Sequence, residues 1–196
     1  MNETIEKTGG TAAYRPRLSY YHANSKGTGS ALQMELHPAH DETAGSIFLS
    51  IAHHKTTGSR EPGNIIMPSF DWKNKAVLKL DASDLSQILQ VMRGIQENIA
   101  DGKGLFHRSV NATTVIKFEH RIEPRPGYAF DVWKKPHDGD QQHYYFTFDP
   151  SEAFFLMLAL EQSAGVIAFG IPQVIPRAKT YENVRIATPV AANDPF

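Results

Sequence analysis

A strand, a helix cap and a helix start occur twice in this sequence, and this repeat restricts the possible folds more than any other feature. "KAVLKLDASDL" and "HYYFTFDPSEA" align without a gap, with their aspartates 68 residues apart at positions 81 and 149. Aliphatic or aromatic residues typical of strands precede Asp81 and Asp149, which are good N-cap residues. An acid follows three positions later, where the helix dipole favours negative charge, and Pro150 suits a first helical position. Each copy therefore predicts a strand that runs into a helix.

Further strand candidates surround both copies. In the first unit they lie at residues 18–23, 30–37 and 46–55, followed by a polar Gly- and Pro-rich loop over 56–72 that we interpret as functional or mobile. The helix predicted over 81–101 has one apolar stripe, formed by Leu85, Ile88, Leu89, Met92, Ile95 and Ile99. In the second unit the strands lie at 105–110, 113–122, 128–135 and 142–148, before the helix "SEAFFLMLALEQS".

The resulting fold class is α+β, with two tandem ββββα units, two antiparallel four-stranded sheets and two helices packed between them. We expect one domain over residues 17–171, with repeats at 17–102 and 103–171. An N-terminal arm at 1–16 and a tail at 172–196 flank it. The second helix is apolar nearly all round, so it must be covered on several sides, including by another subunit.

Composition restricts the compartment and the class of partner. Of 196 residues 41% are hydrophobic and none is cysteine, which excludes disulfides and zinc–thiolate sites and fits a reducing compartment. "MNETIEKTGG" has no apolar core of the kind that a signal peptide needs. The apolar run 153–171 contains Glu161, and a central acid costs roughly 2.5–3.5 kcal/mol in lipid, so we interpret this run as a core helix. We expect a cytoplasmic protein, nucleoid-associated if bacterial, without a membrane partner.

Charge is distributed unevenly along the chain. The net charge is −1, yet residues 103–135 hold seven Lys or Arg against three acids. The helical stretch 81–101 holds four acids against one Arg, and 149–163 holds three acids and no base. Positive strands and negative helices would attract a polyanion to one side of the molecule. This pattern favours a nucleic-acid-binding sheet.

Three stretches, "SKGTGSALQMEL", "FDWKNKAVLKLDASDL" and "GYAFDVWKKPHDGDQQHYYFTFDPSEAFFLMLAL", occur in an order and at a spacing that resemble the Whirly family of single-stranded-DNA-binding proteins. "SKGTGSALQMEL" is similar to the family's Lys-Gly-Lys-Ala-Ala-Leu motif, with Thr28 in place of the second lysine and one extra residue. "FDWKNKAVLKLDASDL" is similar to its Tyr-Asp-Trp stretch, and "GYAFDVWKKPHDGDQQHYYFTFDPSEAFFLMLAL" to its last two strands and helix. The resemblance spans about residues 18–170. It implies a homotetramer with helices at the centre, sheets radiating outward, and single strands of DNA lying across the sheets and between subunits.

Single strands are bound by basic side chains together with aromatic rings on which bases stack. The candidate contacts on the predicted sheets and turns are Tyr20, Tyr21, Lys26, Phe48, Lys55, Lys73, Lys75, Lys117, Arg121, Trp133, Lys134 and Lys135. The candidate oligomer-interface residues are Phe154, Phe155 and Leu158. Aromatic residues in strands belong to the core more often than they contact a ligand. We interpret Trp72 as a structural residue that anchors its loop by packing, not as a DNA contact.

Enzyme motifs are not found in the sequence. "KGTGSA" is neither a P-loop nor a dinucleotide fingerprint, and His53, His54 and the "HPAH" segment lack a third ligand at metal-binding spacing. We expect no catalytic residue, metal or cofactor. The predicted function is sequence-independent single-stranded DNA binding in protection, repair, recombination or transcription. The alternatives are an RNA-binding protein of the same fold, or a scaffold protein that has lost nucleic-acid binding.

Overall fold

A computed structural model describes residues 17–40 and 42–170 of the chain. The predicted arm at 1–16 and the tail at 172–196 lie outside the described residues. The helices are α1 (Ala82–Met92) and α2 (Pro150–Phe169), with short 3₁₀ helices η1 (Trp72–Asn74) and η2 (Ile99–Gly102). The strands are β1 (Arg17–His22), β2 (Ser30–His37), β3 (Ser46–Thr56), β4 (Ser59–Glu61), β5 (Asn64–Ile66), β6 (Ser69–Phe70), β7 (Ala76–Leu80), β8 (Leu105–Arg108), β9 (Ala112–Arg121), β10 (Gly127–Pro136) and β11 (Gln142–Phe148).

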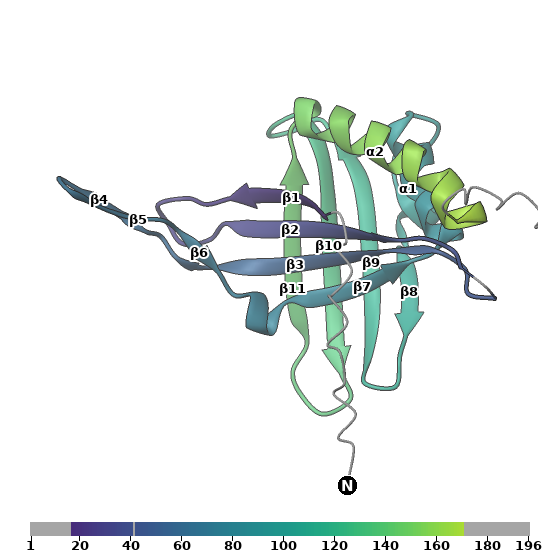
Figure 1. Cartoon of the computed structure of the whole chain (residues 1–196), viewed down its shortest axis with the longest axis horizontal. Coiled ribbons are helices and arrows are strands. Elements are labelled where there is room, and N and C mark those ends of the chain that lie inside the picture. The colour runs from purple at the N-terminus through teal and green to yellow at the C-terminus, as the bar shows by residue number, and fades with distance from the viewer. Residues whose placement is uncertain (1–16, 41, 171–196) are drawn as a thin grey trace, which may run out of the picture.

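The strands form two antiparallel meanders, one from each repeat. The N-terminal sheet has the order β1-β2-β3-β7, with β6 pairing the far end of β3, and the C-terminal sheet has the order β8-β9-β10-β11. Each meander is followed by its helix, so the predicted ββββα units are confirmed. In Figure 1 the strands of one sheet run across those of the other, and both helices lie at the same end of the molecule.

The 68-residue repeat is visible in the structure of both strand–helix junctions. Leu78 and Leu80 of β7 are buried, as are Phe146 and Phe148 of β11, because side chains alternate between the two faces of a strand. Asp81 and Asp149 cap α1 and α2, each accepting hydrogen bonds from two backbone N–H groups of the first turn. In both caps the acid at the third helical position bonds back to the cap residue, which completes a capping box.

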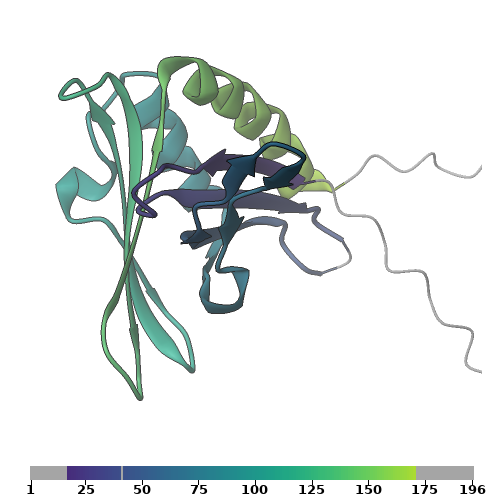
Figure 2. The same ribbon diagram turned by 90° about the vertical axis from the view of Figure 1, so that its left-hand side faces the viewer.

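The inner faces of the two sheets share one core. The rings of β11 pack on the N-terminal sheet, where Tyr20 lies 5.2 Å from Phe148 and His53 stacks 4.7 Å from Tyr144, measured between ring centroids. The helices pack on each other, with α1 also on β9 and α2 also on β2, β10 and β11. Figure 2 shows the sheets meeting along the middle of the molecule and α2 running over the end where they diverge.

The segment predicted as a loop over 56–72 contains strands, which corrects that prediction. β4 and β5 pair as a hairpin that projects from the far end of β3 (Figure 1). Pro62 and Gly63 form its turn, and the positive φ of Gly63, 82°, suits the third position of a type II turn. β6 then returns along β3. The turn dipeptide was present in the sequence, but the strands that flank it are only three residues long.

The first helix is shorter than predicted, and the second is longer. α1 ends at Met92 because Gly94 takes a positive φ of 69°, and the N–H groups of Gly94 and Ile95 donate to the carbonyls of Val91 and Gln90. These two bonds form a Schellman motif, which stops the helix. Ile95 is consequently exposed, whereas Ile99 is buried within η2.

Candidate nucleic-acid interface

The outward face of the N-terminal sheet carries a cluster of aromatic rings contributed by β1, β6 and η1. Tyr21 is 55% exposed, and its ring centroid lies 5.7 Å from that of Phe70 and 6.5 Å from that of Trp72. The ammonium of Lys75 lies 6.0 Å from the Trp72 centroid, within cation–π distance. The imidazole of His54 packs on Phe70 at 5.3 Å. One exposed ring, two half-buried rings and a lysine thus stand together, a combination that suits stacking of bases beside phosphates.

The 3₁₀ helix η1 positions Trp72 and Lys75. Asp71 caps η1, and its carboxylate accepts hydrogen bonds from the backbone N–H and the side-chain amide of Asn74. The Asn74 side-chain hydrogen bond lowers the pKa of Asp71, and Lys55 contributes to the same direction. Lys73 is exposed within η1. The "DWKNK" stretch therefore acts as a rigid turn that presents two lysines and an indole.

Phe48 lies on the same outward face, further along the sheet. It forms part of the lining of a ≈280 Å³ groove that also contacts Lys75. The ring of His37 packs on it at 4.4 Å, and Lys79 is its neighbour on β7. Lys26 lies apart from these residues, exposed in the turn between β1 and β2.

The outward face of the C-terminal sheet carries a second ring cluster. Trp133 stacks on His143 with centroids 4.1 Å apart and planes 18° from parallel. The Nε2 atom of His143 lies 2.8 Å from an Asp131 carboxylate oxygen, which fixes the imidazole in place. Trp133 remains 38% exposed, and Lys117 stands beside Asp131 on the neighbouring strand. This face therefore also offers a ring next to a basic side chain.

Two more basic residues of the prediction lie on this face. Arg121 donates a hydrogen bond to the Tyr145 hydroxyl, and its guanidinium carbon lies 5.9 Å from that ring's centroid. Its Nε atom is 3.6 Å from a carboxylate oxygen of Glu119. Lys135 is exposed near the end of β10. Arg121 is thus held in position by its neighbours, whereas Lys135 is solvated.

Besides Lys26, the structure places Tyr20 and Lys134 away from the other predicted contacts. The Tyr20 ring packs against the core, and its hydroxyl donates to the Glu152 carbonyl at 3.4 Å. Lys134 is half-buried on the opposite face of β10, where it lines a ≈650 Å³ cavity shared with Asp84 and His107. The reason is the strand's two-residue period, which sends neighbouring side chains to opposite faces.

The sequence prediction missed several residues of these two outward faces. Side chains two residues apart on a strand share a face, and so do residues paired across neighbouring strands. Starting from Trp133, Lys117 or Lys75, this rule identifies most of them once the strand register is known. The missed residues are Phe70, Lys79, Phe106, His143 and Tyr145. Trp72, interpreted as structural, is half-buried and packs against Tyr21 and Lys75 in this cluster.

Helix α2 leaves one apolar side uncovered in the single chain. Ala153, Leu156, Leu160 and Ile167 are buried, whereas Phe154, Phe155 and Leu158 are 60%, 59% and 42% exposed. These three residues, together with Phe169, follow helical spacing and form what we call the α2 stripe. By length and composition α2 could also cross a membrane, a weak indication because core helices of soluble proteins meet the same criteria.

Histidine and carboxylate side chains do not gather into a metal-ligand set. Within residues 17–40 and 42–170, no group of three or more His, Asp or Glu residues has a metal-binding arrangement. His53 and His54, the adjacent pair considered in the sequence, project to opposite faces of β3 and contact Tyr144 and Phe70 instead.

Comparison with known proteins identifies the architecture. The sequence matches no protein-family model and no curated protein. Among solved structures, WHY1 of Arabidopsis thaliana superposes with a TM-score of 0.62 at 16% identity, covering 81% of this chain and 88% of WHY1. WHY3 of the same plant gives 0.58 at 16%, covering 80% and 90%, and the plant transcriptional regulator PBF-2 gives 0.58 at 16%, covering 80% and 84%. These likenesses and the paired ββββα units show that the chain has a Whirly-like fold.

Proposed function

We propose that this protein binds single-stranded DNA, largely without regard to sequence, through the outward faces of its two sheets. The observation that carries the proposal is the same on both faces: exposed aromatic rings stand beside basic side chains. On the N-terminal sheet the exposed ring of Tyr21 stands beside the half-buried Trp72 and Lys75. On the C-terminal sheet the exposed Trp133 shares its face with Lys117, which lies one pair further along the strands.

The combination favours single strands over duplex. Stacking on a protein ring needs an unpaired base, and each base–ring stack contributes roughly 1–3 kcal/mol. In a duplex the bases already stack on one another, so only the phosphate contacts would remain. The protein's near-neutral net charge, −1, makes those contacts alone a weak source of affinity.

The fold supports the same class of function. A superposable structure is that of PBF-2, a plant transcriptional regulator. We propose that this chain acts by binding rather than by catalysis, in protection, repair, recombination or transcription of DNA. An RNA strand offers the same unpaired bases and phosphates, so RNA is the second candidate ligand.

We further propose that the protein assembles as a homotetramer through α2. The exposed rings of Phe154 and Phe155, with Leu158, form an apolar surface that a closed symmetric assembly would remove from water. Assembly would also bring the sheets of neighbouring subunits side by side, which extends the path available to a strand.

The test is an anisotropy titration with labelled oligothymidylate, its duplex and an RNA of the same length. We expect the DNA single strand to bind more tightly than the duplex. Trp133→Ala should weaken binding by roughly 1–3 kcal/mol through lost stacking. Lys135→Ala should lower the slope of log affinity against log salt by about 0.7, the contribution of one phosphate contact.

Lys134→Ala is the matched control, because Lys134 adjoins Lys135 but projects to the opposite face of β10. It should leave both affinity and salt slope unchanged. Duplex binding as tight as that of the single strand would remove base stacking from the proposal. Tighter binding of RNA would favour the RNA candidate, and no binding at all would favour a scaffold role.

A further inference from the structure

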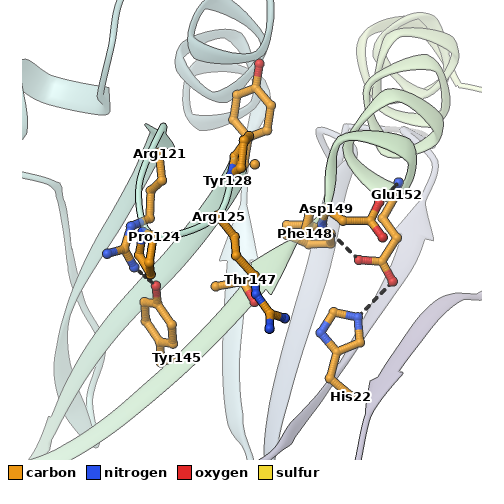
Figure 3. Close-up of a pocket in the computed structure, with 12 residues that line it drawn as sticks. His22, Arg121, Pro124, Arg125, Tyr128, Tyr145, Thr147, Phe148, Asp149 and Glu152 are labelled. Carbon is orange, nitrogen blue, oxygen red and sulfur yellow. Dashed lines mark hydrogen bonds and ion pairs between the residues drawn. The ribbon is translucent and has the colours of Figure 1, made fainter.

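A cavity of ≈490 Å³ opens where the turn between β9 and β10 meets β11 and the start of α2 (Figure 3). Its volume lies in the range of small-molecule sites, roughly 300–1,000 Å³. The ring of Tyr145 provides an aromatic wall, and Pro124 and Pro126 stiffen the turn that borders the cavity. The cavity is therefore large enough for one nucleotide and has one ring, that of Tyr145, against which a base can pack.

Arg125 is the charged group in this cavity that has no partner among the described residues. Within residues 17–40 and 42–170 it makes no ion pair or hydrogen bond, although it lines the cavity. Figure 3 shows its side chain extending into the space between Tyr145 and His22. Arg121, by contrast, is fixed at the wall by Tyr145 and Glu119. Two guanidinium groups, one fixed and one available, border the same space.

The acids of the cavity are already engaged. Asp149 accepts hydrogen bonds from the backbone N–H groups of Ser151 and Glu152 at 2.8 and 2.9 Å. Glu152 accepts one from the Asp149 N–H at 3.1 Å, and its other oxygen lies 2.7 Å from the His22 Nε2 atom. In Figure 3 these carboxylates lie on the side opposite Arg121. The cavity is thus positive at one side and negative at the other.

This polarity selects a type of ligand. A strand that crossed the cavity would carry phosphates past both carboxylates, which would repel it. A single terminal phosphate can instead stay at the arginine side. A phosphate monoester carries more negative charge at neutral pH than a phosphodiester, and the planar guanidinium group binds such oxygens with two parallel hydrogen bonds.

We propose that this cavity binds the terminal phosphate monoester of a nucleotide, with Arg125 as its main ligand, Arg121 as its second, and the ring of Tyr145 packing against the sugar or base. The phosphate belongs either to the end of a bound strand or to a free mononucleotide. If the phosphate is the end of a strand, the proposal rests on the proposed single-strand binding, and the cavity would fix where the bound strand ends.

The first experiment compares three oligothymidylates of one length, bearing a 5′-phosphate, a 3′-phosphate or hydroxyls at both ends. One terminal phosphate should tighten binding roughly tenfold, as a charge-assisted hydrogen bond of about 1.5 kcal/mol would. Arg125→Gln should abolish this preference while leaving the affinity for the hydroxyl-ended strand unchanged. Arg60→Gln, which removes an exposed arginine from the distant β4–β5 hairpin, should retain the preference.

The second experiment follows backbone amide signals by NMR while thymidine monophosphate or thymidine is added. The site is supported if thymidine monophosphate, but not thymidine, shifts amide signals within residues 121–128, and if these shifts disappear in Arg125→Gln. If they occur without a preference for phosphate-ended strands, the ligand is the free nucleotide. Absence of both the shifts and the preference overturns the cavity assignment. Tight binding of the hydroxyl-ended strand in that case leaves the proposed sheet interface standing.

Discussion

The environment of the Tyr20 hydroxyl favours its protonated form. Burial, reinforced by the nearby Glu152 carboxylate, raises its pKa from 10.0 to about 12. Because the folded protein holds this proton more tightly than the unfolded chain does, Tyr20 does not affect the pH dependence of stability below pH 10.0. Between pH 10.0 and about 12 the unfolded chain releases the proton first, so the free energy of unfolding falls as pH rises.

Tyr20→Phe should remove this contribution to the alkaline loss of stability. At neutral pH the variant should lose less than about 1 kcal/mol, since the hydroxyl makes one long hydrogen bond. Across the window from pH 10.0 to about 12 it should gain relative to the wild type. Urea denaturation at neutral pH and at a pH inside that window measures the difference in the free energy of unfolding between variant and wild type. Tyr21→Phe, at an exposed tyrosine, is the control. A difference between Tyr20→Phe and wild type that is the same at both pH values would contradict the prediction.

The same pair of tyrosines shows what single residues in the sequence can predict. Tyr20 and Tyr21 are adjacent and chemically identical, and only the pairing of β1 with β2 decides that Tyr20 packs in the core and Tyr21 faces outward. Lys134 and Lys135 differ in the same way. Residue type therefore led to the prediction that each of these strands contributes to a binding site. Which of two neighbouring side chains faces outward depends on the strand register. Register is fixed by contacts with strands far along the chain.

Each helix cap is contacted by a histidine from the other repeat. His22 of β1 lies 2.7 Å from Glu152 of α2, and His107 of β8 lies 3.2 Å from Asp84 of α1. Both acids occupy the third position of their helix, and both histidines stand on the first strand of their sheet. The two repeats are therefore tied crosswise by equivalent histidine–carboxylate contacts, which supports one joint core.

Replacing these histidines should destabilise the fold, and His107→Phe should cost more than His22→Phe. Asp84 is buried, so removing its partner leaves a poorly solvated carboxylate, at a cost of roughly 1–3 kcal/mol. Glu152 is more accessible to water, so we expect His22→Phe to lower the free energy of unfolding by less than about 1 kcal/mol. Double-mutant cycles with Asp84→Asn and Glu152→Gln, measured by chemical denaturation, give the two coupling energies. A larger coupling for His22–Glu152 would reverse this ranking.

At the level of elements, the sequence predicted what is encoded locally. The caps at Asp81 and Asp149 and the strands before them follow from a few neighbouring residues, and all are present. The signal that ends α1, Gly94, is also local. The prediction passed over it because the apolar Ile95 and Ile99 continue the helical spacing beyond Gly94. The β4–β5 hairpin was missed because its strands are short and its exposed isoleucines show no alternation.

At the scale of the whole molecule, the distribution of surfaces suggests how copies associate. The outward faces of the sheets are mixed in charge and ring content, whereas the α2 stripe is almost purely apolar. Contiguous apolar surface of this kind is uncommon on monomers and marks an interaction site. The sequence predicted this stripe from Phe154, Phe155 and Leu158, because a helix that is apolar on all sides has more surface to bury than one sheet and one helix can cover.

Assembly can be tested at the α2 stripe. Burial of each phenylalanine side chain contributes about 1.5–3 kcal/mol, and a symmetric assembly repeats every contact, so a charge placed there should prevent association. Phe155→Glu should convert a particle several times the 21.8 kDa chain mass into a monomer and weaken single-strand binding without altering either sheet face. Val110→Glu, at an exposed apolar residue away from the helix, should change neither property. Light scattering coupled to gel filtration measures the mass, and circular dichroism checks that the variant is folded. A wild-type monomer that still binds DNA tightly would refute both the α2 interface and a binding path shared between subunits.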